Sequence, residues 1–212
     1  VGSEMCIRDS STTVELDQAV EAATAAFSDW SSLTIRDRAQ VAYRYRSLLE
    51  SHTEELAELV HLENGKTVAE GRAEVAKAIE VTEFACSLPQ LVAGEVLEVS
   101  PGVECRVDHC PLGVVASVTP FNFPCMVPHW TIPIAITLGN AYILKPSEQV
   151  PLTARRSAEL LAEAGLPDGV FQMINGDRRI VEAICDHPGI SAVAFVGSTP
   201  VARSVYLSLI HI

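Results

Sequence analysis

The stretch "GVVASVTP" at residues 113–120 is a short apolar run that ends in polar residues. Three later stretches have the same character: "NAYILKP" (140–146), "GVFQMING" (169–176) and "ISAVAFVGS" (190–198). Continuous apolar runs of this length are typical of strands buried on both faces. Helical patterns separate them, at residues 126–140, 152–167 and 178–189. Strands that alternate with helices predict βαβ units, and therefore an open α/β parallel sheet from about Gly113 onward.

The residues before this sheet have a helical pattern. A first helix is expected behind a cap at Thr12, because apolar residues recur there at helical spacing, at Leu16, Val20, Ala23 and Phe27. Two more helices are expected after it, the first capped by Thr34 and the second closed by Gly65. The parallel sheet is therefore expected to follow a helical layer.

A fourth helix is expected in "TVAEGRAEVAKAIEVTEFACSLP" (67–89). Its apolar stripe would consist of Val75, Ile79 and the Phe84 side, and it should stop before Pro89. After a loop, "ECRVDHC" (104–110) alternates enough to predict a half-exposed strand.

Composition narrows the class of protein. The 212 residues carry a formal net charge of −12, which argues against nucleic acid or an anionic membrane as a partner. No apolar run is long enough to span a membrane, and "VGSEMCIRDS" (1–10) lacks the apolar core of a secretory signal. The six cysteines are scattered without a CxxC pair, so reduced thiols and a cytoplasmic location are expected. The six histidines are equally scattered and predict no zinc cluster.

Polar residues follow three of the predicted strands, in "TPFNFP" (119–124), "KPSEQ" (145–149) and "GSTP" (197–200). Ligands of open α/β sheets collect outside the carboxyl ends of the strands, so these side chains should converge on one edge. Ser198 would stand at the start of a helix, where the dipole favours a phosphate. Lys145 and Glu148 would offer a cation and a carboxylate, and a carboxylate can accept both hydroxyls of a ribose while repelling a 2′-phosphate.

Each of these motifs also has a plain structural interpretation. "GSTP" can be an ordinary helix cap with proline in the first turn, and "KPSE" can be a turn that opens a helix. No GxGxxG fingerprint is present.

In combination the motifs are more specific. "TPFNFP", "LGNAYILKPSE", "LAEAGLPDGVFQMINGD" and "AFVGSTPVAR", in that order and spacing, resemble the cofactor-domain motifs of the aldehyde dehydrogenase superfamily. "HLENGKT" (61–67) resembles a pattern in the N-terminal helices of those enzymes, and the extended "PFNFP…VP" stretch most resembles their CoA-acylating methylmalonate-semialdehyde dehydrogenase branch. The resemblance covers residues from about Thr12 to Tyr206.

This resemblance implies a reaction and a catalytic residue. The family forms a thiohemiacetal between a cysteine thiolate and an aldehyde, passes hydride to NAD, and releases the thioester to coenzyme A or water. The asparagine of its motif, here Asn122, stabilises the developing oxyanion, and removing one such donor typically costs roughly 10²–10³ in rate. Cys125 lies where relatives usually carry an apolar residue and has no evident base or cation beside it, so we interpret it as a packing thiol.

The resemblance also assigns the cofactor contacts. Thr119 and Phe121 would flank the nicotinamide half of NAD, and Ser198 would contact the pyrophosphate. The adenosine ribose would be held by Lys145, Glu148 and Gln149.

Two positions depart from the family pattern. Lys77 lies where methylmalonate-semialdehyde enzymes tend to have an arginine for the substrate carboxylate, and lysine lacks the bidentate fork. A substrate role for Lys77 and a solvated helix face are equally compatible with the sequence. Ala202 stands where many members of the superfamily have glycine.

The family's catalytic cysteine and general-base glutamate lie well beyond the GST motif, so this chain is expected to be an inactive N-terminal fragment. Both terminal segments resemble translated adapter sequence. The expected organisation is a non-family segment 1–11, the N-terminal helical part of the cofactor domain 12–100, an oligomerisation-type strand 101–112, incomplete NAD-binding βαβ units 113–206, and a non-family segment 207–212. The full-length enzyme would be a homo-oligomer acting on a small aldehyde.

Three alternatives remain open from the sequence. The enzyme could release a free acid to water instead of an acyl-CoA. The chain could be a non-catalytic binding protein on the same scaffold. A thiol hydrolase could also be built on Cys110 or Cys125 with His109 or His129.

Overall fold

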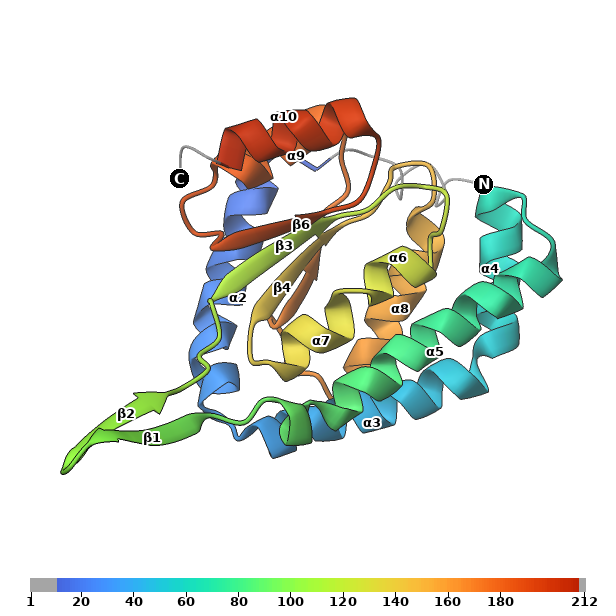
Figure 1. The fold of residues 1–212 in the computed structure, drawn as a ribbon. Coiled ribbons are helices and arrows are strands. Elements are labelled where there is room, and N and C mark those ends of the chain that lie inside the picture. Colours follow the sequence, from blue (N-terminus) through green and yellow to red (C-terminus); the bar gives the residue numbers. More distant parts are fainter. Residues whose placement is uncertain (1–10, 210–212) are drawn as a thin grey trace.

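The structure is a computed structural model that describes residues 11–209. A four-stranded sheet lies at its centre between helices, and a two-stranded hairpin projects from one end (Figure 1). Cys6 and nearly all of the expected non-family segment 1–11 lie outside the described residues, as do residues 210–212 of the other expected segment.

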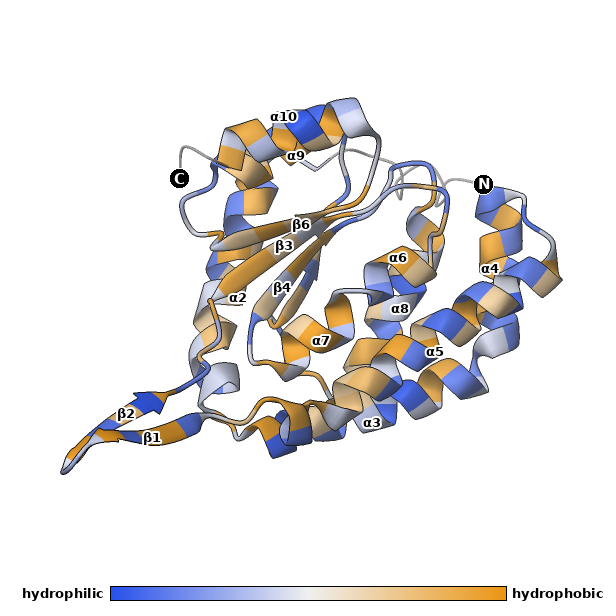
Figure 2. Cartoon of the chain, in the orientation of Figure 1, coloured by the Kyte–Doolittle hydropathy of each residue, from blue (hydrophilic) through white to orange (hydrophobic). Residues whose placement is uncertain are grey.

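All four strands of the central sheet are parallel, in the order β5-β4-β3-β6. Their bounds are β3 (Val114–Val118), β4 (Ala141–Lys145), β5 (Phe171–Met173) and β6 (Ala192–Phe195). Every residue of β3 and β4 is buried, since helices cover both faces, and the strands are correspondingly apolar (Figure 2). The expected α/β fold with a parallel sheet is confirmed.

Side chains of β3 alternate between two hydrophobic cores. Val114, Ala116 and Val118 pack in one core with α2 (Thr13–Ser32) and α9 (Arg178–Asp186). Val115 belongs to the opposite core, which contains residues of α3 (Ile35–Ser51), α4 (Thr53–Asn64), α5 (Val68–Leu91), α7 (Ile132–Thr137) and α8 (Pro151–Glu163). The short helix α6 (Met126–His129) lies on this side, and α10 (Thr199–Leu209) packs against α9 (Figure 1).

The expected helix boundaries in the N-terminal layer are largely confirmed. Thr12 caps α2 through a reciprocal capping box, in which its hydroxyl accepts from the Glu15 backbone N–H (3.3 Å) and the Glu15 carboxylate accepts from the Thr12 N–H (2.6 Å). Thr34 caps α3. Gly65 ends α4 at φ 79°, a left-handed conformation that glycine adopts without steric cost.

Two expectations for the fourth helix are wrong. The fourth helix does not stop before Pro89, because α5 continues to Leu91. Pro89 lacks an N–H donor and its ring crowds the carbonyl of the preceding turn. The helix continues past it because Leu88 is buried in the last turn and its carbonyl accepts from the Val92 N–H (2.9 Å). Phe84 is half-exposed, so it does not extend the apolar stripe.

The helical pattern at residues 126–140 forms two short helices, α6 and α7, instead of one. Pro133 lies in the first turn of α7, where the missing N–H costs nothing. The proline thus starts a new helix and does not continue the previous one.

The hairpin consists of β1 (Glu95–Ser100) and β2 (Val103–Val107), paired antiparallel. The strand expected at 104–110 is present as β2, but all of its residues are exposed, so it has no buried face. Its partner β1 lies in a region expected to be a loop. Within residues 11–209, no helix has both the length and the apolar character needed to cross a membrane.

Candidate cofactor site

The parallel register brings three strand ends side by side. Val118 at the end of β3 is opposite Lys145 of β4 on one side and Phe195 of β6 on the other. The pairing extends one residue further, since the Thr119 N–H donates to the Lys145 carbonyl (3.1 Å) and the Val196 N–H donates to the Val118 carbonyl (3.1 Å). The loops that follow these strands therefore start from one edge of the sheet.

A cavity of about 230 Å³ lies at this edge. Four of the predicted site residues line it: Thr119, Lys145, Glu148 and Ser198. The convergence expected for the loops after β3, β4 and β6 is thus present in the structure. Each loop supplies at least one polar side chain to the same space.

Lys145 and Glu148 form an ion pair in the cavity wall, with Nζ 3.1 Å from Oε2. Lys145 is 4% exposed, whereas the side chain of Glu148 is half-exposed and can reach a ligand. Partial burial acts to raise the pKa of Glu148, but hydrogen bonds from its own backbone and from Lys145 outweigh it and lower the pKa below the ordinary value. Glu148 is therefore ionised at neutral pH and able to accept hydrogen bonds.

Ser198 occupies the N-cap position of α10. Its carbonyl accepts the first helical hydrogen bond, from the Ala202 N–H (2.9 Å). Ser198 and Gly197 are exposed at the cavity, so the positive end of α10 faces it. This position suits an anionic group.

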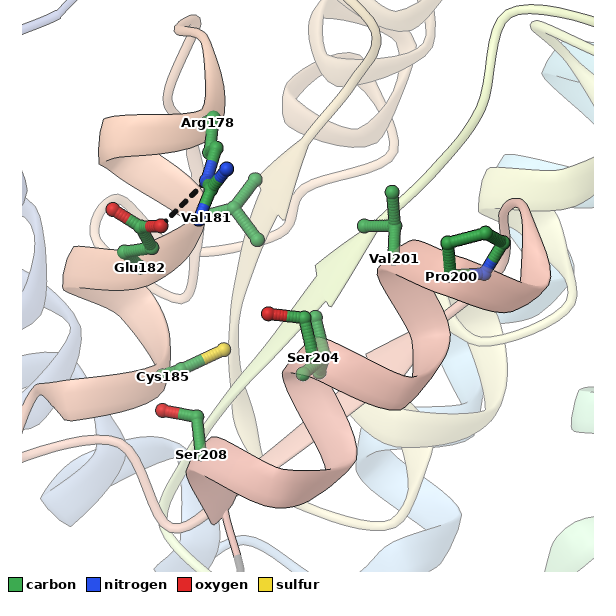
Figure 3. A pocket seen from close by; sticks show the side chains of 9 residues that line it. Arg178, Val181, Glu182, Cys185, Pro200, Val201, Ser204 and Ser208 are labelled. Atoms are coloured by element: carbon green, nitrogen blue, oxygen red, sulfur yellow. Dashed lines mark hydrogen bonds and ion pairs between the residues drawn. The ribbon is translucent and has the colours of Figure 1, made fainter.

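A second cavity, of about 440 Å³, lies between α9 and α10 (Figure 3). It shares Arg178, Val181 and Val201 with the first cavity, so the two cavities adjoin, and we refer to them together as the hollow. Val181 and Val201 point toward each other across it (Figure 3). The hollow therefore has a polar end at the strand termini and an apolar slot between the two helices.

Sequence reasoning gave no role to Asp177, Arg178, Val181 or Val201. Two of these residues lie in quoted family-like stretches, Asp177 at the end of "LAEAGLPDGVFQMINGD" and Val201 in "AFVGSTPVAR". Asp177 accepts from the Arg179 N–H (2.9 Å) as the cap of α9, and it also lines the first cavity. The valines lie on two different helices, and only the tertiary fold brings them together.

Asn122 and Phe121 do not line either cavity. Both lie in the exposed loop that follows β3, two and three residues after Thr119, and Phe121 is half-exposed. Residues of the helical layer hold this loop by its backbone: Asn64 Nδ2 donates to the Phe121 carbonyl (2.8 Å) and Lys66 Nζ donates to the Asn122 carbonyl (2.6 Å). Asn122 is thus exposed on a loop whose backbone is bound to the helical layer.

Two further predicted residues lie away from the cavity. Gln149 is exposed next to Glu148, and its N–H donates to Ser147 Oγ (3.3 Å). Lys77 is exposed on α5 and pairs with Glu80 at 2.6 Å. The structure does not bring Lys77 to the residues that line the cavity.

Cys125 is fully buried in the core, in agreement with its interpretation as a packing thiol. Burial, together with the negative charges of Glu74 and Glu63, raises the pKa of its thiol far above the ordinary value. His129 bonds to the backbone carbonyl of Cys125 (2.7 Å), and burial lowers the pKa of His129 to about 4. A thiol that stays protonated beside a histidine bonded elsewhere does not form a nucleophile–base pair, which argues against a thiol hydrolase at this position.

Comparisons with known proteins agree with this architecture. A model described as "Aldehyde dehydrogenase family" matches residues 2–210. Malonate-semialdehyde dehydrogenase 2 of Geobacillus thermodenitrificans (strain NG80-2) is 50% identical over 193 residues, which are 91% of this chain and 40% of that protein. The chain thus spans about 40% of the length of the curated relatives it matches.

Two solved structures have the same fold. The methylmalonate-semialdehyde dehydrogenase from Oceanimonas doudoroffii superposes with a TM-score of 0.94 at 43% identity, over 96% of this chain and 42% of that one. A protein from Sinorhizobium meliloti 1021, described as a methylmalonate-semialdehyde dehydrogenase complexed with NAD, gives a TM-score of 0.94 at 42% identity with the same coverage. The resemblance stated from the sequence motifs is confirmed.

Proposed function

Since the chain belongs to the aldehyde dehydrogenase family, we propose that it forms the NAD-binding part of an enzyme that oxidises malonate or methylmalonate semialdehyde to an acyl-CoA. The observation that carries this proposal is the single cavity that receives the loops after β3, β4 and β6. The similarity of the chain to malonate- and methylmalonate-semialdehyde dehydrogenases, one of them complexed with NAD, supports this proposal.

The chemistry of the cavity fits a dinucleotide. The start of α10 at Ser198 suits a pyrophosphate, and the half-exposed carboxylate of Glu148 can accept hydrogen bonds from ribose hydroxyls. The apolar slot between Val181 and Val201 suits the flat adenine ring. Because Glu148 would repel a 2′-phosphate, NAD is the proposed cofactor and not NADP.

Bound NAD would be the hydride acceptor. In the proposed arrangement Glu148, with Lys145 and Gln149, holds the adenosine ribose. Thr119 and Phe121 flank the nicotinamide half. Asn122 donates a hydrogen bond to the aldehyde oxygen as negative charge develops on it, and its amide does this without titrating.

The proposed reaction needs a cysteine thiolate, and none of the cysteines that the structure describes lines the first cavity. Cys185 lines the second cavity, but burial raises the pKa of its thiol. Among the cysteines that the structure describes, Cys86, Cys125 and Cys185 are buried, and Cys105 and Cys110 are exposed in or next to the hairpin. We therefore propose that the chain alone does not oxidise aldehydes, and that the nucleophile and the general base belong to a further part of a homo-oligomeric, cytoplasmic enzyme. Coenzyme A is the proposed acyl acceptor.

Two alternative functions of the chain predict different results in assays of NADH formation and NAD binding. An enzyme that uses water as acceptor would form NADH at the same rate with and without coenzyme A and would release a free acid. A non-catalytic binding protein would bind NAD without any turnover. The side chains of Lys145 and Glu148, gathered in one cavity with Ser198, favour a dinucleotide ligand in all of these cases.

The test is an assay of NADH formation from malonate semialdehyde. The protein assayed contains this chain and has the full length of the aldehyde dehydrogenases that it matches. We expect turnover that requires coenzyme A, and Asn122→Ala should lower kcat by roughly 10²–10³. The isolated chain should form no NADH. Unchanged turnover in Asn122→Ala would contradict the proposed catalytic role.

A further inference from the structure

Four residues of the helical layer contact the loop that leaves β3 or the start of α8. Glu63 and Asn64 end α4, Lys66 follows in the connection to α5, all within the "HLENGKT" stretch, and Glu74 comes from α5. We refer to these four residues as the loop clamp. None of them lines the cavity.

Glu74 is the buried member of the loop clamp, at 3% exposure. Its Oε1 accepts from the backbone N–H groups of Cys125 (2.7 Å) and Met126 (3.0 Å), and its Oε2 accepts from Lys66 Nζ (2.7 Å). Both carboxylate oxygens thus have charged or backbone partners. A buried carboxylate is tolerated only with such partners, so its position is tightly determined.

Lys66 connects Glu74 to the backbone around Asn122. Its ammonium group donates to Glu74 and to the Asn122 carbonyl, and it lies 3.6 Å from the centre of the Phe123 ring. Asn64 holds the preceding carbonyl, that of Phe121. Backbone groups at both ends of the segment 121–126 are therefore bound to the loop clamp.

The end of α4 also binds the start of α8, the helix that follows the loop after β4. The carboxylate of Glu63 accepts from the N–H groups of Leu152 (2.7 Å) and Thr153 (3.0 Å), in the first turn of α8. Burial raises the pKa of Glu63 against the effect of these hydrogen bonds. The end of α4 and the residues after it thus bind both the loop with Asn122 and the start of α8, the helix that follows the loop with Glu148.

The side chain of Asn122 is exposed, and the backbone that carries it sets the position and direction of its Cα–Cβ bond. We propose that Lys66 and Glu74 are positioning residues, whose ion pair fixes the backbone of residues 121–126 and so aims the Asn122 amide at the reacting carbonyl oxygen. This inference rests on the proposed function for the role of Asn122. The fixing of the loop itself does not depend on any ligand.

The first test is amide hydrogen exchange of the chain without NAD or aldehyde. Lys66→Met and Glu74→Ala should raise exchange in the segment 121–126, at the amides of Cys125 and Met126 that donate to Glu74, by about tenfold to a hundredfold, as expected for the loss of charged hydrogen bonds. Glu74→Gln, which keeps an acceptor for the two N–H groups, should give a smaller rise and serves if Glu74→Ala fails to fold. Arg72→Met is the matched control, because it removes an exposed ion pair with Glu54 from the same helix.

Exchange in residues 121–126 that is unchanged in Lys66→Met and Glu74→Gln would overturn the proposal. So would a rise that extends equally to β3 and α8, because it would indicate a general stabilising role. In the longer enzyme the same two variants should lower kcat while KM for NAD stays within about twofold, and Lys66→Arg should recover part of the lost kcat. A loosened loop with full kcat would overturn the aiming of Asn122, whereas an inactive parent enzyme would instead contradict the proposed function.

Discussion

The stability of the chain should decrease as the pH falls from about 6.5 to about 4, because of one buried histidine. His129 is fully buried, with Nδ1 2.7 Å from the Cys125 carbonyl and Nε2 2.7 Å from the Tyr45 hydroxyl. The carbonyl can only accept, so Nδ1 carries the proton and Nε2 accepts from Tyr45. Protonation of Nε2 would break this arrangement inside the core.

Burial lowers the pKa of His129 from 6.5 to about 4, although the hydrogen bond to Cys125 acts in the opposite direction. The unfolded chain therefore binds a proton in this pH range that the folded chain does not bind, and stability falls as the pH decreases through it. Each unit of difference between the pKa of His129 in the unfolded and in the folded chain corresponds to about 1.4 kcal/mol, so the full loss in the free energy of unfolding is about 3 kcal/mol. Between pH 7 and pH 5.5 the loss is about 1 kcal/mol.

The assay is urea unfolding at a series of pH values, for the wild-type chain and for His129→Gln. The variant is less stable at neutral pH, but it lacks the titrating group, so its stability should fall less steeply between pH 7 and pH 5.5. All other histidines and carboxylates are common to both proteins and cancel in the comparison. Parallel pH profiles would refute the assignment of this effect to His129.

Two further predictions concern the packing and the thiols. Trp30→Phe removes the hydrogen bond from the buried indole N–H to the Ile136 carbonyl (2.9 Å), so the free energy of unfolding should fall by about 2 kcal/mol in urea titrations; a change below about 0.5 kcal/mol would count against this contact. Maleimide labelling followed by peptide mass spectrometry should modify Cys105 and Cys110 in the native chain well before Cys125, whose thiol is buried and protonated. Labelling of Cys125 as early as that of Cys105 and Cys110 would contradict this prediction and would show that the segment 121–126 opens in the native chain.

Much of the fold follows from local patterns in the sequence. The four apolar runs predicted the parallel strands, and Thr12, Thr34 and Gly65 marked helix boundaries, because caps and buried strands depend on neighbouring residues. The predicted end of α5 was wrong because the packing of Leu88 outweighs the local effect of Pro89. Strand β1 was missed because it is exposed on both faces and has no apolar alternation.

The site could be predicted only where it follows strand ends. Lys145, Glu148 and Ser198 each come directly after a predicted strand, and parallel topology then places them on one edge. The loop clamp is different, because Lys66 and Asn122 are 56 residues apart and their contact depends on how the helical layer packs on the sheet. No local pattern contains that information.

The central claim is that the loops after β3, β4 and β6 form a cradle for NAD, and an NMR titration of the chain with NAD tests it most directly. Backbone amide signals of residues 119–122, 145–149 and 197–201 should shift on addition of NAD, and Glu148→Gln should weaken binding of NAD more than binding of NADP. Shifts confined to other parts of the chain, or equal affinity for NAD in the wild type and in Glu148→Gln, would contradict the claim.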